Sequence, residues 1–400
     1  MANSSSFGNL MDYIAWRGDL PFSQAPCNEI DCLLLAMLSY QRFGPSAASM
    51  EGVPLHELAS AGLECPRDVP FERHRIEMLE KMALAPRYRS MRVFLQQSAT
   101  DVSASTQFSA VSCEIPGEAV VIAYRGTDHT LVGWKEDFMM SYLSPVPAQR
   151  AAVEYLEKVA RLSEGPLILT GHSKGGNLAA YAAAHADESI QKRLVQVFSY
   201  DGPGLDDETI DSQGYERIRP VLHSVIPSGS VVGLLMNYHP DYTVVLSTTV
   251  GLFQHDPYTW EMLGGSFLTA DETTRTSQLM NDTVHEWLKN SSPEKVRGFV
   301  ETLFTTLEKL YPKGGSEDLY EIQLVNMADA ASYVRTVAPE KRNMIVSLLT
   351  SLFAIGKDNY LQIMLQKPLE STLSDLQARL KSLQIPGFLP ESENVKKEKT

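Results

Sequence analysis

The sequence is poor in cysteine and in positive charge. Its four cysteines are scattered over 400 residues without a CxxC pair, which argues against a disulfide scaffold and against structural zinc. Lysine and arginine together number 35 against 49 aspartates and glutamates, a formal net charge of −14. Such an acidic chain would neither neutralise a nucleic-acid backbone nor bind an anionic membrane through charge. We therefore expect no nucleic-acid partner and a reducing, cytoplasmic location.

Long hydrophobic runs are missing as well. A membrane-spanning helix needs about 18 or more consecutive apolar residues, and no window of the chain comes near that length. The most apolar stretch, 344–355, is interrupted by three hydroxyl residues, which predicts a buried helix. Residues 1–20 lack the basic and apolar segments of a secretion signal. These absences predict a soluble protein without a transmembrane segment.

What the chain does contain is the composition of an ordinary globular protein, with 44% hydrophobic and 21% charged residues. The first hundred residues are mainly of helical character, with helices predicted at 29–38 and 73–82. From about residue 107, short apolar strands alternate with helices. The predicted strands are 119–124, 167–170, 194–200, 221–226 and 242–247, and the main helices between them are 148–162 and 177–186. This alternation predicts an α/β fold with a mainly parallel sheet.

Beyond about residue 272 the strand pattern ends and only helices are predicted. We expect an α/β domain with a helical N-terminal part over 1–270, a helical appendix over 271–388 and a frayed tail over 389–400. One appendix helix carries a heptad-like leucine stripe: Leu369, Leu373, Leu376, Leu380 and Leu383. The stripe could pack on its own core, join two copies in a homodimer, or cover the functional site.

The strongest chemical motif is the segment 170–176, which reads TGHSKGG and fits the pattern G-x-S-x-G. A predicted strand precedes it and a small-residue helix follows it, which is the context of a nucleophile elbow. In such a turn Ser173 would be the nucleophile, and the helix N-terminus would favour an oxyanion beside it. The alternative interpretation is a glycine-rich turn with an incidental serine, and the strand–turn–helix context argues against it.

A serine nucleophile needs a base and an acid at the carboxyl edge of the sheet. Of the nine histidines, His255 follows the last predicted strand at that edge, whereas His172 and His185 lie in the elbow and on its helix and cannot turn back on Ser173. As the acid we prefer Asp201, which ends the strand 194–200, to Asp256. The Asp256 side chain would point away from that of its neighbour His255 on extended backbone. A Ser–His dyad remains a further possibility.

Donors to the oxyanion are expected from two places. The first is the amide of Lys174, directly after the nucleophile, and the second is the loop after the first core strand, where Thr127 offers an amide and a hydroxyl. The loop containing Thr127 could also be a simple turn. Several large apolar residues after His255 could bind an acyl chain or only form a structural wall: Phe253, Tyr258, Trp260, Met262 and Phe267.

These motifs together resemble a known family. The segment 121–127, followed by Trp134, Asp137 and the elbow, is similar to the class 3 (fungal-type) lipase pattern. The longer set adds Trp16 and the segments 12–13, 28–31, 201–204 and 254–256, and it resembles the Mbeg-like bacterial family of α/β hydrolases, which has no assigned function. The resemblance covers roughly residues 8–265. It implies a lipase-like fold in which Ser173 is the nucleophile, His255 the base and Thr127 an oxyanion residue.

One departure from the class 3 pattern concerns the acid. In those lipases the acid follows the next strand, where this chain reads PSGS at 227–230 without a carboxylate. The sequence therefore predicts a serine hydrolase of carboxylic esters, of the lipase, esterase or lysophospholipase type, that needs no cofactor or metal. Its substrate would be a small ester or a lipid. The alternatives are a thioesterase or acyltransferase, and an α/β-hydrolase fold used for binding without turnover.

Overall fold

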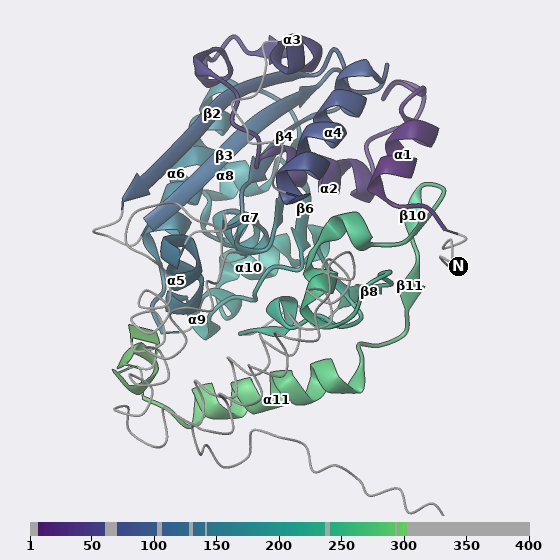
Figure 1. The fold of residues 1–400 in the computed structure, drawn as a ribbon. Coiled ribbons are helices and arrows are strands. Elements are labelled where there is room, and N and C mark those ends of the chain that lie inside the picture. Colours follow the sequence, from purple (N-terminus) through teal and green to yellow (C-terminus); the bar gives the residue numbers. More distant parts are fainter. Residues whose placement is uncertain are drawn as a thin grey trace, which may run out of the picture. The chain divides into compact units, whose positions relative to one another are not determined.

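The computed structural model describes residues 7–60, 70–101, 106–127, 131–140, 142–236, 241–292, 294–298 and 300–301. Their centre is a nine-stranded sheet with the order β1-β2-β3-β4-β5-β6-β7-β8-β11 (Figure 1). The five strands from β4 to β8 pair in parallel. They are β4 (Ala119–Tyr124), β5 (Leu167–His172), β6 (Leu194–Tyr200), β7 (Leu222–Pro227) and β8 (Tyr242–Val245). The α/β fold predicted from the sequence is confirmed.

Helices cover both faces of the parallel strands, and every residue of β4 and β5 is buried. Alternate residues of β4 divide between two cores: Val121 and Ala123 face one, and Val120 and Ile122 face the other. The first core contains α1 (Leu10–Arg17), α2 (Glu29–Leu38) and α4 (Pro70–Leu84), and the second contains α6 (Pro147–Leu162) and α7 (Lys174–His185). This double cover explains the continuous apolar runs of the strands.

Two long antiparallel strands were not predicted. β2 (Arg92–Asp101) and β3 (Thr106–Ile115) extend the sheet beyond β4, with β1 (Val53–Pro54) at the edge. The sequence of β2 hides its period because the pairing with β3 shifts between Phe94 and Gln97, and Leu95 there adopts a positive φ of 53°. A bulge of this kind breaks the alternation of apolar and polar residues by which a strand is recognised.

The remaining elements are short and connect or flank the main ones. The helices are α3 (Leu55–Ser60), α5 (Leu131–Met139), α8 (Glu188–Gln191), α9 (Asp207–Ile210), α10 (Gln213–Ile218) and the longer α11 (Arg275–Lys289). The strands are β9 (Met262–Leu263), β10 (Ser266–Phe267) and β11 (Thr269–Ala270). The 3-10 turns are η1 (Pro45–Ala48), η2 (Arg219–Val221), η3 (Val232–Leu234), η4 (Gly251–His255) and η5 (Pro257–Thr259).

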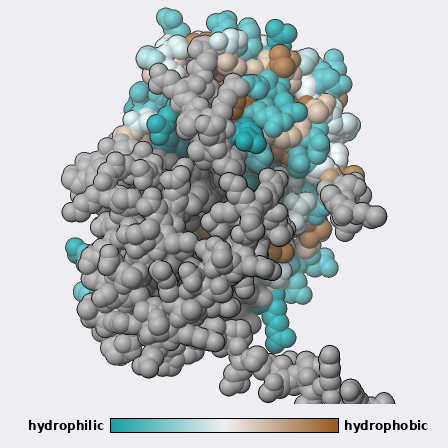
Figure 2. Space-filling model, in the orientation of Figure 1, coloured by the Kyte–Doolittle hydropathy of each residue, from teal (hydrophilic) through white to brown (hydrophobic). Residues whose placement is uncertain are grey.

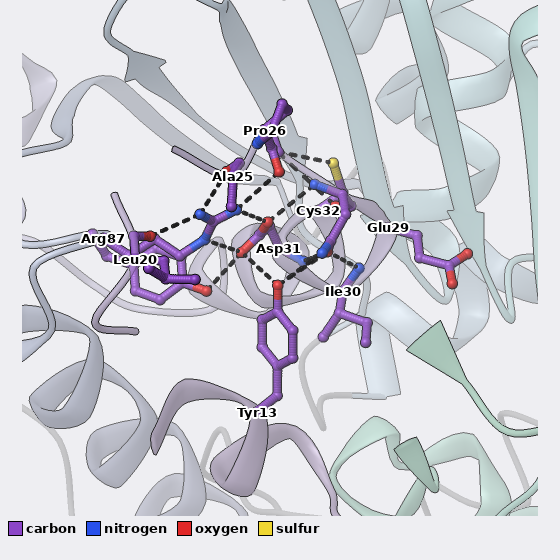
Figure 3. A network of polar contacts seen from close by, with 12 residues as sticks. Tyr13, Leu20, Ala25, Pro26, Glu29, Ile30, Asp31, Cys32 and Arg87 are labelled. Carbon is purple, nitrogen blue, oxygen red and sulfur yellow. Dashed lines mark hydrogen bonds and ion pairs between the residues drawn. The ribbon is translucent and has the colours of Figure 1, made fainter. Parts of the chain in front are cut away.

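A buried ion pair fixes the N-terminal helices to one another (Figure 3). The Arg87 guanidinium donates twice to the Asp31 carboxylate, from Nε at 2.9 Å and from Nη2 at 2.5 Å. Its other N–H groups donate to the backbone oxygens of Leu20, Ala25 and Pro26. Asp31 also accepts from three further groups, the hydroxyls of Tyr13 and Tyr88 and the backbone N–H of Asn28. We call these five residues (Asp31, Arg87, Tyr13, Tyr88 and Asn28) the N-terminal clamp.

The chain divides into two compact units, and the second, residues 306–312 and 323–400, lies outside the described residues, as does the predicted leucine stripe. The predicted domain limits and the homodimer therefore stay predictions. Among the described helices, none is both long enough and apolar enough to cross a membrane. On the face drawn in Figure 2, the described surface shows hydrophobic spots separated by hydrophilic areas.

Candidate active site

The candidate nucleophile occupies a sharp turn between β5 and α7. Ser173 has a φ of 60° and a ψ of −133°, a backbone conformation that is strained for a residue with a side chain. The turn needs glycine on both sides. A Cβ on Gly171 would lie 2.0 Å from the Gly175 oxygen, and a Cβ on Gly175 would lie 2.1 Å from the Tyr124 oxygen. A strand, a strained serine and a helix in this order form the nucleophile elbow of the α/β-hydrolase fold.

Backbone contacts hold Ser173 in place and leave a donor beside it. The Ser173 N–H donates to the Tyr200 oxygen at 2.9 Å, and the Gly176 N–H donates to the Ser173 oxygen at 2.9 Å. Lys174 is the first residue of α7, so its amide has no acceptor within the helix. An amide in this position, at the positive end of the helix, is suited to bind a negatively charged oxygen.

The structure brings His255 and Asp201 into direct contact. His255 ends η4 and donates from Nδ1 to Asp201 Oδ2 at 2.6 Å. Asp201 directly follows β6, has a positive φ of 46° and is only 1% exposed. Because Nδ1 carries the shared proton, Nε2 of the neutral ring is an acceptor, as a general base requires. In the described part of the chain Ser173 Oγ makes no hydrogen bond to His255, and such contacts are often long before substrate binds.

His172 contacts His255 through a hydrogen bond and through its ring. Its Nε2 donates to the His255 backbone oxygen at 2.8 Å, and the two rings lie 4.6 Å apart at an angle of 36°. The hydroxyl of Tyr40 lies 3.2 Å from the other ring nitrogen, Nδ1, which accepts from it. Burial lowers the pKa of His172 well below its usual value, so the ring stays neutral. The sequence excluded His172 as the base but missed this contact, which no spacing rule reveals.

Thr127 lies in the loop after β4, at the position predicted for an oxyanion donor. The preceding residue, Gly126, would place a Cβ 3.0 Å from the Ser173 Cβ, so the loop packs directly against the nucleophile. The Thr127 hydroxyl donates to Asp137 Oδ2 at 2.5 Å. Lys174 Nζ donates to Glu136 Oε2 at 2.8 Å and lies 3.8 Å from Asp137 Oδ1. We call Thr127, Glu136, Asp137 and Lys174 the oxyanion-side cluster.

Burial raises the pKa of Asp137 to about 6, against the opposing effects of Lys174 and the Thr127 hydroxyl. Its Oδ1 atom is buried and accepts no hydrogen bond within the described structure. The link from Lys174 to Glu136 was also missed by the sequence analysis. A signal was present, because a lysine stands in an elbow whose other residues near the serine are small or neutral.

Asp256, the alternative acid, has a different partner. Its Oδ1 accepts from the Tyr258 N–H at 3.0 Å, which caps η5. The loop after β7 contains no carboxylate at 228–231, and its Ser230 contacts Asp201 instead. The apolar residues Tyr258, Trp260, Met262 and Phe267 are buried in the core shared with α1 and α2, and they therefore form a structural wall.

A model of the Mbeg1-like family matches residues 82–305, which is more than half of the chain. The chain belongs to the Mbeg1-like family. This is the family that the sequence motifs of the elbow and of its neighbouring loops resemble.

Other comparisons with this Mbeg1-like chain concern solved structures. M37 lipase is 15% identical with a TM-score of 0.35, and the match covers 52% of this chain and 70% of that one. Rhizomucor miehei lipase in a propeptide complex is 13% identical with a TM-score of 0.33 and coverages of 66% and 78%. A mutant of MDLA from Penicillium cyclopium is 14% identical with a TM-score of 0.34 and coverages of 62% and 90%. No curated protein matches the chain.

Proposed function

We propose that this Mbeg1-like chain is a serine hydrolase that cleaves carboxylic esters of the lipase, esterase or lysophospholipase type through an acyl-enzyme on Ser173. The observation that carries the proposal is the strained serine at the head of α7. Its neighbour His172 contacts His255, whose Nδ1 lies 2.6 Å from a buried carboxylate. A serine, a carboxylate and a histidine in this order along the chain are the elements of acyl-transfer catalysis on this fold.

The reaction proceeds in two steps. His255 Nε2 takes the proton of Ser173 as its oxygen attacks the ester carbonyl, and the negative oxygen of the tetrahedral intermediate is stabilised by the amides of Lys174 and Thr127. The protonated His255 then gives its proton to the leaving alcohol, and the acyl group stays on Ser173. In the second step water attacks the acyl-enzyme with His255 as the base, which releases the acid and restores the serine.

Asp201 acts as the acid of this triad. Its Oδ2 accepts the Nδ1 proton of His255, which fixes the ring tautomer and stabilises the charged ring that forms during the reaction. The net charge of −14 favours uncharged esters, monomeric or micellar, over an anionic membrane surface. The sparse, scattered cysteines support a reducing compartment, and we infer a cytoplasmic location.

A fluorophosphonate probe tests the proposal directly. Wild-type protein should be labelled on Ser173 and should hydrolyse p-nitrophenyl esters, whereas Ser173→Ala should lose both properties. Ser112→Ala is a matched control, because Ser112 is a buried serine on β3 whose hydroxyl is hydrogen-bonded to Tyr155. Asp201→Asn should lower the rate by about 10⁴-fold. If folded wild-type protein is not labelled by the probe, the proposed hydrolase activity fails and only a binding role remains.

The substrate class is resolved by a panel of esters with increasing acyl length, measured beside the corresponding thioesters. A clear preference for thioesters would favour the thioesterase alternative, and transfer of the acyl group to an added alcohol would favour an acyltransferase. A wild-type rate in Asp201→Asn would transfer the role of the acid to Asp256 or leave a Ser–His dyad.

A further inference from the structure

The acid Asp201 is held by a loop that supplies no acid of its own. The loop follows β7, and β7 pairs in parallel with β6, so both strands end at the same edge of the sheet. Asp201 is tied to this neighbouring strand through its backbone, since its N–H donates to the Val225 oxygen at 2.8 Å. The loop after β7 and the Asp201 carboxylate therefore lie side by side, next to His255.

Two groups of the loop contact the carboxylate oxygen that His255 does not use. The Ser230 hydroxyl donates to Asp201 Oδ1, and the Gly233 N–H donates to the same atom at 3.1 Å. The hydroxyl oxygen of Ser230 in turn accepts from the Gly233 N–H at 3.0 Å. A Cβ on residue 233 would lie 2.5 Å from Asp201 Oδ1, so glycine leaves the space that the carboxylate occupies.

The two carboxylate oxygens consequently have separate tasks. The final torsion of an aspartate side chain has only a broad preference, so a carboxylate with one partner can rotate. Ser230 and the Gly233 N–H together hold Oδ1, and this leaves Oδ2 facing His255 Nδ1 at 2.6 Å. Both residues are almost fully buried, with 2% of Ser230 and 1% of Asp201 exposed. Water therefore cannot easily replace the hydroxyl as a donor.

Ser230 itself is held from two sides. Its N–H donates to the Pro227 oxygen at 2.9 Å, and its backbone oxygen accepts from the Ser277 hydroxyl of α11. The beginning of α11 makes a second contact with the loop, since the Thr274 N–H donates to the Ser228 oxygen at 2.6 Å. The backbone that carries the Ser230 hydroxyl is thus hydrogen-bonded on both sides, independently of Asp201.

From these contacts we infer that Ser230 is a positioning residue, whose hydroxyl orients the Asp201 carboxylate toward His255. The inference deepens the proposed function and depends on it for its catalytic meaning. The hydroxyl does not touch the reacting atoms. It acts through Asp201, to which it donates a hydrogen bond. A hydrogen bond to a charged carboxylate is stronger than one between two neutral groups.

The test compares Ser230→Ala with Ser230→Thr, which keeps the hydroxyl, and with Ser112→Ala, which removes a buried serine hydroxyl that is bonded to Tyr155 and not to a site residue. With p-nitrophenyl butyrate, kcat of Ser230→Ala should fall about tenfold while KM changes by less than about twofold. Ser230→Thr should recover most of the loss. Wild-type kinetics in Ser230→Ala, or an equal loss in both Ser230 variants, would overturn the inference.

A spectroscopic measurement separates this inference from the proposed function. In protein with ¹⁵N-labelled histidine, the Nδ1 proton of His255 should give a far-downfield NMR signal that shifts or broadens in Ser230→Ala and stays in place in Ser112→Ala. If wild-type protein hydrolyses no ester, the proposed function fails but this signal still tests the contact. If Ser230→Ala does not fold, Ser230→Cys has nearly the same shape with a weak donor and should show the same loss. An unchanged signal would contradict the inference.

Discussion

Two buried groups of charges in this protein, the N-terminal clamp and the oxyanion-side cluster, differ in how completely they are paired. In the clamp, the Asp31 carboxylate accepts five hydrogen bonds, two of them from Arg87. In the oxyanion-side cluster, Asp137 accepts from Thr127 through one oxygen while the other, Oδ1, is buried without a hydrogen bond in the described structure. A fully paired network stabilises and orders a fold, whereas an incompletely paired one reduces stability.

The difference in pairing corresponds to where the clamp and the oxyanion-side cluster lie in the fold. The clamp joins α1 and α2 to the turn after α4, and within the described part of the chain none of its hydrogen bonds goes to a candidate site residue. The oxyanion-side cluster, in contrast, includes Thr127 and the Lys174 side chain beside the nucleophile. We therefore expect changes in the clamp to affect stability alone, and changes in the cluster to affect stability and activity in opposite directions.

The largest effect is expected from breaking the clamp. Arg87→Met removes the positive partner and leaves a buried carboxylate, which should lower the free energy of unfolding by about 3–5 kcal/mol. The double variant Asp31→Asn with Arg87→Met removes both charges and should be less destabilised than the single variant. Urea denaturation measures both values, and fluorophosphonate labelling per folded molecule should not change.

An exposed ion pair is the matched control for this prediction. Arg92 and Glu114 lie 3.2 Å apart with 47% and 43% of their side chains exposed, and Arg92→Met should cost less than about 1 kcal/mol. If Arg87→Met lowered the free energy of unfolding as little as Arg92→Met does, the clamp would not be a stabilising network distinct from the oxyanion-side cluster. Reduced labelling of the folded Arg87→Met protein would remove the distinction as well.

The second effect concerns Asp137, whose pKa is raised from its ordinary value to about 6 by burial. The native state therefore binds a proton more tightly than the unfolded state, so the ionised group destabilises the fold as pH rises from about 4 to above 6. Asp137→Asn should raise the free energy of unfolding by about 3 kcal/mol at pH 8 and by about half as much at pH 5. Labelling should nevertheless slow about tenfold, because Thr127 loses a hydrogen bond to a charged acceptor.

Urea denaturation of Asp137→Asn and wild type at the two pH values decides between the possible explanations. A gain in stability that is equal at pH 5 and pH 8 would come from packing and not from the charge. A loss of stability at pH 8 would show that Lys174 needs Asp137 as well as Glu136, and the pairing in the cluster would then be complete.

Most of the fold could be predicted from local sequence because the parallel strands are covered on both faces. β4 and β5 are continuous apolar runs, and the elbow between β5 and α7 is a motif of adjacent residues. β2 and β3 could not be recognised, because the bulge at Leu95 disrupts the period and long-range pairing supplies the stability. Local pattern was sufficient where burial was complete, and it failed at the sheet edge.

The site shows the same limit for pairs that are distant in sequence. The preference for Asp201 rested on which strand ends at which edge, and the structure does bring Asp201 to His255. Its catalytic role stays a prediction. The contact from Ser230 to Asp201 and that from His172 to the His255 backbone depend on loop geometry, which residue spacing does not determine. From the sequence we could see only that the loop at 227–230 lacks a carboxylate.

The smallest effect is expected at Tyr40, which lies just beyond α2, the helix that contains Asp31, and whose hydroxyl contacts His172 beside the nucleophile. Burial raises the pKa of Tyr40 to about 12, so its hydroxyl remains a donor to the neutral His172 ring. Tyr40→Phe removes this bond and should reduce stability by about 1 kcal/mol and the labelling rate by roughly threefold. Tyr155→Phe, which removes a buried hydroxyl from the second core, should lose stability without a change in labelling. If both variants label at the wild-type rate, His255 does not depend on the N-terminal helices, and the clamp stabilises a part of the fold that the site does not use.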